Sequence, residues 1–160
     1  MFGSVLPNST IAMKVGASEV FRGKSGRFVV ADDAGYVDAM AATGVKVLGW
    51  MEGNDDFTSI ATDGSTVRLV ETDIYGKLFC MPACKDSGAA VTEAQLQAAV
   101  GTTFDIQKVS TYYQYADLGA SSVDILIGYG YVYEGSSAGQ QWMIVKINAA
   151  KVVLTTHTDV

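Results

Sequence analysis

Short apolar runs separated by clusters of turn-forming residues fill the chain from residue 26 onward. Runs of β-branched and aromatic residues bounded by Gly, Asp and Asn are typical of strands. In the first half they predict strands over residues 27–31, 36–40, 45–51, 57–62, 66–71 and 77–81. Asp32 to Gly35 and Asp63-Gly64 predict hairpin turns, because Asp bonds its own backbone and Gly adopts positive φ. The sixth strand is expected to end at Pro82, which cannot donate to a ladder.

The hydrophobic spacing changes at residue 91. Thr92 and Gln95 form the pattern of a capping box, and apolar residues then recur at helical spacing until Gly101. This pattern predicts one short helix near residues 92–100. Its apolar stripe is narrow, so we expect the helix to pack on a sheet rather than to form a separate domain.

Strand patterns resume after the helix, over residues 104–106, 109–116, 123–133 and 141–148. The pattern therefore predicts a mainly β fold, a small β-barrel or sandwich with one short helix. We expect an N-terminal arm over residues 1–14, a single β-rich domain over residues 15–150 and a C-terminal strand or tail over residues 151–160. The sequence contains no evident internal repeat.

Composition narrows the classes of partner. The chain has 160 residues, 49% of them hydrophobic and 18% charged, with a formal net charge of −6. Its length suits one domain, and its hydrophobicity argues against disorder. The acidic balance lacks the basic surface that nucleic acids require. So few charges indicate either a surface rich in Ser, Thr, Gly and Gln or a surface partly covered by other subunits.

The ends and the cysteines exclude several other classes. Residues 1–13 carry no charged side chain and are interrupted by Pro7 and Asn8, unlike a signal peptide, and no apolar stretch is long enough to span a membrane. We therefore expect a soluble protein made in the cytoplasm. Cys80 and Cys84 lie about 13 Å apart if their segment is extended, too far for a disulfide. With His157 they provide too few ligands for structural zinc, so two reduced thiols are expected.

The sequence offers no assembled catalytic set. The single histidine, His157, lies in the C-terminal tail, and Gly23-Lys24-Ser25 lacks the upstream glycine of a phosphate-binding loop. Asp32-Asp33 and Asp55-Asp56 have the composition of acid pairs or calcium ligands, but both fall in predicted turns. We expect no catalytic, cofactor or metal site. A small hydrolase stays possible only if one carboxylate pair is catalytic.

Tyrosines gather in two of the later strands, where odd-numbered residues share one side. Three roles remain open for them: core packing, a subunit interface and a platform for stacking sugars. The residues are Tyr112, Tyr113, Tyr115, Tyr129, Tyr131 and Tyr133.

Three segments together resemble the capsid decoration, or cement, proteins of tailed bacteriophages. The first is VFRGKSGRFVVADDAGYV at residues 20–37 with VLGW at residues 47–50, similar to the opening strands of their small β-barrel. The second runs from Leu96 through a short helix into GTTFDI at residues 101–106. The third joins VDILI at residues 123–127 with QWMIVKI at residues 141–147, similar to a closing strand pair. The resemblance spans about residues 16–150 and rests on spacing and strand character.

The resemblance implies a β-tulip-like barrel and a structural, non-enzymatic virion protein. Such a protein, often a homotrimer, would bind the major capsid protein on the exterior of the expanded capsid and stabilise the shell. An uncharged N-terminal arm would then contact the capsid or a neighbouring subunit. The candidate contact residues are Phe2, Val5, Leu6, Ile11, Tyr113 and Tyr115. The alternative, suggested by the tyrosine-rich strands, is a carbohydrate- or receptor-binding β module of a phage fibre.

Overall fold

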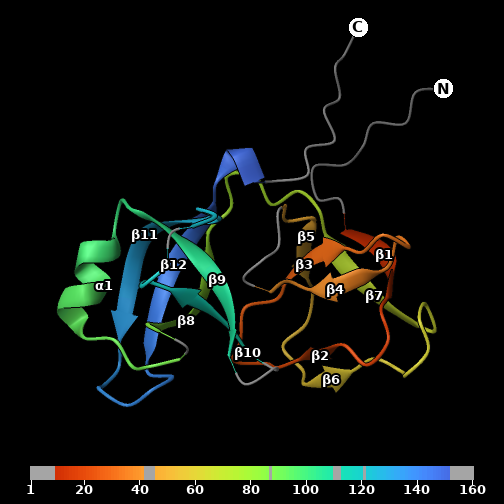
Figure 1. Cartoon of the computed structure of the whole chain (residues 1–160), viewed down its shortest axis with the longest axis horizontal. Coiled ribbons are helices and arrows are strands. Elements are labelled where there is room, and N and C mark those ends of the chain that lie inside the picture. Colours follow the sequence, from red (N-terminus) through yellow and green to blue (C-terminus); the bar gives the residue numbers. More distant parts are fainter. Residues whose placement is uncertain (1–9, 42–45, 87, 110–112, 121, 152–160) are drawn as a thin grey trace, which may run out of the picture.

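The protein contains two closed five-stranded barrels that lie side by side along its longest axis (Figure 1). The computed structural model describes residues 10–41, 46–86, 88–109, 113–120 and 122–151. The first barrel consists of β1 (Thr10–Val15), β3 (Phe28–Ala31), β4 (Val37–Ala39), β5 (Gly49–Met51) and β7 (Thr66–Glu71). The second consists of β8 (Phe79–Cys84), β9 (Thr103–Val109), β10 (Tyr113–Asp117), β11 (Leu126–Tyr133) and β12 (Gln141–Ile147).

Four short elements complete the described fold. Strands β2 (Val20–Phe21) and β6 (Phe57–Thr58) pair with each other beside the first barrel. Helix α1 (Glu93–Ala99) packs on β11 and β12 at the far side of the second barrel (Figure 1). A 3₁₀ turn, Ala149–Lys151, follows β12.

Both barrels have the same strand order. In each, the first strand pairs parallel with the third and antiparallel with the fifth, as β1 does with β4 and β7 and β8 does with β10 and β12. The second strand lies between the third and fourth, and the fourth pairs with the fifth. The topology therefore repeats, although no sequence repeat predicts it.

Strand alternation divides the first barrel's side chains between two apolar clusters. Val29 and Met51 point into the barrel, while Phe28 and Trp50 point toward the second barrel. There, Phe28 meets the Trp50 ring edge-on at 4.7 Å, and Trp50 stacks on Phe79 at 4.8 Å. This aromatic group belongs to the cluster that fills the second barrel, so the two barrels share a continuous core.

Gln114 provides the polar connection between the barrels. Its side-chain carbonyl accepts from the Phe28 N–H at 2.9 Å, and its side-chain amide donates to the Phe28 carbonyl at 2.7 Å. Its backbone N–H donates to the Ser25 hydroxyl, and its carbonyl accepts from the Gly26 N–H. Gln114 is 3% exposed, so these bonds satisfy polar groups that would otherwise be buried without partners.

The structure confirms the mainly β, barrel-type fold with one short helix. The capping box forms: the Thr92 hydroxyl accepts from the Gln95 N–H, and the Gln95 side chain accepts from the Thr92 N–H. Two barrels replace the single one expected. Among the described residues, no helix is long and apolar enough to cross a bilayer.

Three expectations about local structure are wrong. The Asp63-Gly64 turn joins no hairpin, because β6 pairs with β2 while the Asp63 carboxylate accepts from the Ala17 N–H. Strand β8 continues beyond Pro82 to Cys84, and its pairing with β10 starts directly after the proline, at Ala83. The arm predicted over residues 1–14 is too long, because residues 10–15 form β1 and pair with β7 along their whole length.

Candidate functional site

The outward side of β8, β11 and β12 is predominantly apolar. Val132 pairs across the sheet with Trp142, and Cys80 pairs with Ile144. Residues opposite each other on adjacent antiparallel strands project to the same side. We call these side chains, together with Ile127, the outer apolar face; its members are Cys80, Ile127, Val132, Trp142 and Ile144.

Strand β12 is largely apolar on both of its sides. Its inward residues, Met143, Val145 and Ile147, are at most 1% exposed. Its outward residues Trp142 and Ile144 are half-buried, and Val132 beside them is 42% exposed. Strands with apolar residues on both sides are normally covered on both sides. Among the described residues, the barrel core covers the inward side of β12, while its outward side is half-covered.

Charge is sparse on the outer apolar face and lies at its margins. Lys146 follows Ile144 on the same side of β12, and its ammonium lies 5.5 Å from the centre of the Tyr129 ring. At the other end, Glu134 follows β11 and is close enough to Cys80 to raise the pKa of that thiol, although burial is the larger cause. The face thus has a positive end and a negative end.

A second candidate site is the junction hollow, which lies between the barrels and has a volume of about 540 Å³. Its first-barrel side comes from the loops at residues 22–24 and 54–56. Its second-barrel side comes from Tyr113 and Tyr115 of β10 and from Gly139. Sites for small molecules commonly occupy about 300–1,000 Å³ and lie where domains meet.

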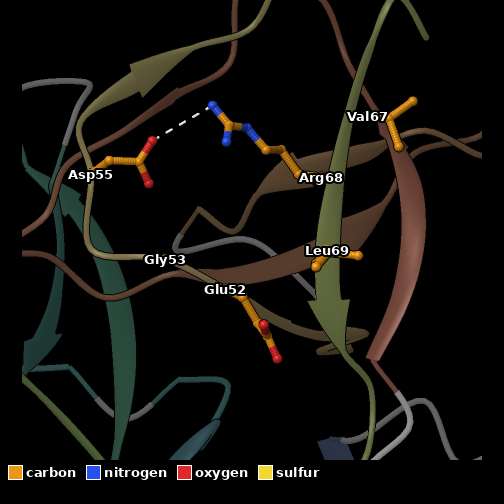
Figure 2. Close-up of a pocket in the computed structure, with 6 residues that line it drawn as sticks. All are labelled: Glu52, Gly53, Asp55, Val67, Arg68 and Leu69. Atoms are coloured by element: carbon orange, nitrogen blue, oxygen red, sulfur yellow. Dashed lines mark ion pairs between the residues drawn. The ribbon is translucent and has the colours of Figure 1, made fainter.

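A third hollow, of about 370 Å³, lies on the first barrel between the loop after β5 and strand β7 (Figure 2). Arg68 reaches across it toward Asp55 at 3.6 Å, while the side chain of Glu52 points away from that pair. The Arg68 guanidinium also lies 4.2 Å from the Phe57 ring centre. Glu52 accepts from the Thr10 hydroxyl at 2.8 Å.

Arg27 lies beneath the same loop and is 2% exposed. Its guanidinium donates to the carbonyls of Met51 and Asp55 and pairs with the Asp55 carboxylate at 3.8 Å. Burial, more than any charge, lowers the pKa of Arg27. The charged groups around the third hollow therefore have partners within the protein, which indicates a structural role for them.

The two candidate carboxylate pairs also form local contacts. Asp32 accepts from the Ala34 and Tyr36 N–H groups, as expected for a turn. Asp56 accepts from the Gly23 N–H and pairs with Arg22, whereas Asp55 pairs with the two arginines beneath and across the third hollow. Within the described ranges, no three metal-binding side chains cluster as a cation site.

The two cysteines lie on one strand, and both are free thiols. Cys80 is exposed on the outer apolar face, and Cys84 is buried. Burial, followed by the charge of Asp117, raises the pKa of Cys84 to about 12, so this thiol stays protonated at neutral pH. His157 lies outside the described residues.

The predicted contact residues divide into three groups. Phe2, Val5 and Leu6 lie outside the described residues. Ile11 is 47% exposed on β1 of the first barrel. Tyr113 and Tyr115 are half-buried on β10 of the second barrel, where their ring centres lie 6.4 Å apart and they line the junction hollow.

The sequence interpretation missed the residues of the outer apolar face. Their signal was the run Gln141–Ile147, in which both alternating sets of positions are largely apolar. A β-bulge between Gly128 and Gly130 also changes the tyrosine pattern. Tyr129 is left out of the paired register, while Tyr131 packs against the core and Tyr133 is 36% exposed.

Comparison of the chain with known protein families, with curated proteins and with solved structures finds no match.

Proposed function

We propose that this chain is a structural virion protein that binds and stabilises the expanded capsid of a tailed phage as a homotrimeric decoration protein. It would be made in the host cytoplasm, bind the major capsid protein and act on the capsid exterior without catalysis. The observation that carries the proposal is the outer apolar face, a sheet surface suited to contact with another protein and only half-covered by the described residues.

Closed barrels explain why such contact would be made through a face. A closed barrel has no free strand edge to which a partner strand can add. Association through the barrels must therefore bury side chains, and the outer apolar face is rich in the aromatic and aliphatic groups found at interface centres. The low charged fraction of the chain is consistent with burial of part of its surface.

The two ends of the outer apolar face carry opposite charges. Lys146 and Glu134 lie toward these ends, so the positive end of one copy would meet the negative end of another. Such a face suits a two-fold contact as well as a ring, so the trimer is proposed from the resemblance to decoration proteins. The proposed capsid or subunit contacts remain those of the sequence analysis: Ile11, Tyr113 and Tyr115, with Phe2, Val5 and Leu6 beyond the described residues.

The first test separates assembly from capsid binding. Light scattering measures the solution mass, and co-sedimentation with expanded, undecorated capsids measures binding. We expect a trimer that sediments with capsids. Ile144→Lys places a charge in the outer apolar face, so it should yield monomers and weaken capsid binding, because several weak contacts per trimer are lost together.

Ile60→Lys is the matched control, because Ile60 is 60% exposed in the loop between β6 and β7 and lies outside the face. It should leave both mass and sedimentation unchanged. A folded wild-type monomer that fails to bind capsids would refute the proposal. Equal loss of assembly in the two variants would show that added charge, rather than the face, was responsible.

A further inference from the structure

The junction hollow contains an aromatic wall with unused hydrogen-bonding groups. Tyr113 and Tyr115 flank Gln114 on β10, so strand alternation turns both rings away from the buried glutamine and toward the hollow. Neither phenol hydroxyl bonds to another described residue. Burial raises the pKa of Tyr115, which keeps this hydroxyl protonated and able to donate. Such rings present an apolar surface beside a polar tip.

The opposite wall is held in place by its own contacts. Asp56 accepts from the Gly23 N–H at 2.7 Å and pairs with Arg22 at 3.6 Å, which links the two first-barrel loops. Ser25, directly after this loop, is bonded to the backbone of Gln114. Both walls are therefore anchored through the junction, and the hollow is formed before any ligand enters.

One positive charge in the hollow has no partner in the described part of the chain. Lys24 is exposed and forms no ion pair or hydrogen bond with a described residue, and the same holds for the Asn54 side-chain amide. Arg22 and Asp56 offset each other, so Lys24 makes the hollow net positive in a chain of charge −6. An anionic group would be attracted there, most strongly at low ionic strength.

We propose that the junction hollow binds an acidic saccharide. The apolar face of a sugar ring packs on Tyr113 and Tyr115, and its hydroxyls bond to the phenols and to Asn54. The carboxylate of the sugar faces Lys24. A neutral sugar leaves the ammonium without a counter-charge, and a simple carboxylate leaves the aromatic wall uncovered. This inference does not rest on capsid binding, although Tyr113 and Tyr115 are also proposed contact residues.

The test compares three probes with the full-length protein by ligand-observed NMR titration. Methyl β-D-glucuronide has both the ring and the carboxylate, methyl β-D-glucoside has the ring alone, and acetate has the carboxylate alone. We expect the glucuronide to bind about fivefold more tightly than the glucoside at low salt, a ratio that one surface ion pair supports. Acetate should not compete. In 0.5 M salt the Debye length falls to about 4 Å, so screening of the exposed charges should remove the preference for the glucuronide.

Two substitutions locate the effect. Lys24→Gln should remove the preference for the glucuronide but leave glucoside binding unchanged, and its exposed turn position should preserve the fold. Tyr113→Leu should weaken binding of both sugars. Lys14→Gln removes an exposed lysine of β1 in the first barrel and should change neither affinity.

Four results would overturn the proposal: no saturable sugar binding, equal affinity for both sugars, displacement of the glucuronide by acetate, or the same loss in Lys14→Gln as in Lys24→Gln. Capsid co-sedimentation of Lys24→Gln should match the wild type. A failure of sugar binding therefore leaves the capsid proposal standing, and the converse also holds.

Discussion

The side-chain amide of Gln114 binds both backbone polar groups of Phe28, at 2.9 Å and 2.7 Å, as a neighbouring strand would. The two residues are 86 positions apart and belong to different barrels. Because the Phe28 ring lies in the aromatic group between the barrels, the amide fixes the backbone that carries this ring. Polar and apolar contacts thus define one relative position of the barrels.

Gln114→Ala should be strongly destabilising. It leaves the buried Phe28 N–H without a partner, at a cost of about 1–3 kcal/mol, whereas the Phe28 carbonyl still accepts from the Met40 N–H. We expect the free energy of unfolding to fall by about 1–3 kcal/mol, measured by urea denaturation. Gln97→Ala, on the exposed surface of α1, is the control and should be nearly neutral. A loss below about 1 kcal/mol would show that the junction does not depend on this amide.

Asp105 organises the loop before β11 through its buried carboxylate. The carboxylate accepts from the N–H groups of Ser122, Val123 and Asp124 and from the Ser122 hydroxyl, and Asp105 is 3% exposed. Asp105→Asn replaces one accepting oxygen with a donor that faces other donors. We expect a loss of about 2–4 kcal/mol by urea denaturation, because bonds to a charged acceptor are strong. Asp33→Asn, in an exposed turn, is the control and should leave the free energy of unfolding unchanged. An equal loss in the two variants would contradict the role given to the bonds of the Asp105 carboxylate.

Gly128 and Gly130 offer a matched pair within β11. A Cβ at Gly128 would collide with the Ala99 carbonyl at the end of α1 and lie 2.9 Å from the Met143 side chain. At Gly130 the nearest atom would be Ile144 Cδ1, at an ordinary 3.5 Å. Gly128→Ala should therefore displace the helix and lower stability by about 1–3 kcal/mol, with Gly130→Ala close to wild type. Thermal unfolding measures the stability of both variants. An equal loss of stability in the two would show that the effect comes from the backbone entropy of the strand rather than from contact with the helix.

Local chemistry made part of the fold predictable from the sequence. The Thr92 capping box lies within one turn, and the strand at residues 66–71 has its predicted bounds. The pairing of strands was harder to predict from the sequence, because it depends on contacts between residues that are far apart in the chain. The Asp63-Gly64 turn has hairpin chemistry, yet its bonds lead to β1 rather than to a hairpin partner.

The candidate sites, too, were only partly predictable from the sequence. The tyrosines of β10 were identifiable from composition, but the hollow they line requires the first-barrel loop at Lys24, which only the tertiary fold brings near. The outer apolar face had a sequence signal in the run from Gln141 to Ile147. That run indicates burial on both sides; which side faces the core follows only from the closure of the second barrel.

Cys80 can report on coverage of the outer apolar face. Burial and Glu134 raise the pKa of this thiol, so at pH 8 it should react with a disulfide reagent more slowly than free cysteine. Cys84, buried and with a pKa of about 12, should react only after unfolding. We therefore expect one slowly reacting thiol in the monomeric Ile144→Lys variant and none in the assembled wild type. Equal labelling rates in the two would mean that assembly does not cover this face.

Asp38 lies on β4 in an acidic environment. Burial is the largest cause that raises the pKa of its carboxyl. The negative charges of Glu19, Asp32 and Asp63 raise this pKa further, and the positive charge of Lys108 lowers it. The folded protein therefore holds the Asp38 proton more tightly than the unfolded chain does. Ionisation of Asp38 lowers stability as the pH rises above its ordinary pKa of 3.8, and this cost is fully present at neutral pH.

Asp38→Asn should consequently increase stability at pH 7, because it removes the unfavourable ionisation while preserving the shape of the side chain. The gain should shrink as the pH falls and vanish near pH 3, where Asp38 is protonated in both the folded and the unfolded chain. Urea denaturation of wild type and variant across this range measures the difference. Asp33→Asn, on an exposed turn, should show no comparable dependence. A gain that persists unchanged at pH 3 would mean that the carboxamide makes new contacts, and that repulsion among these carboxylates is not its cause.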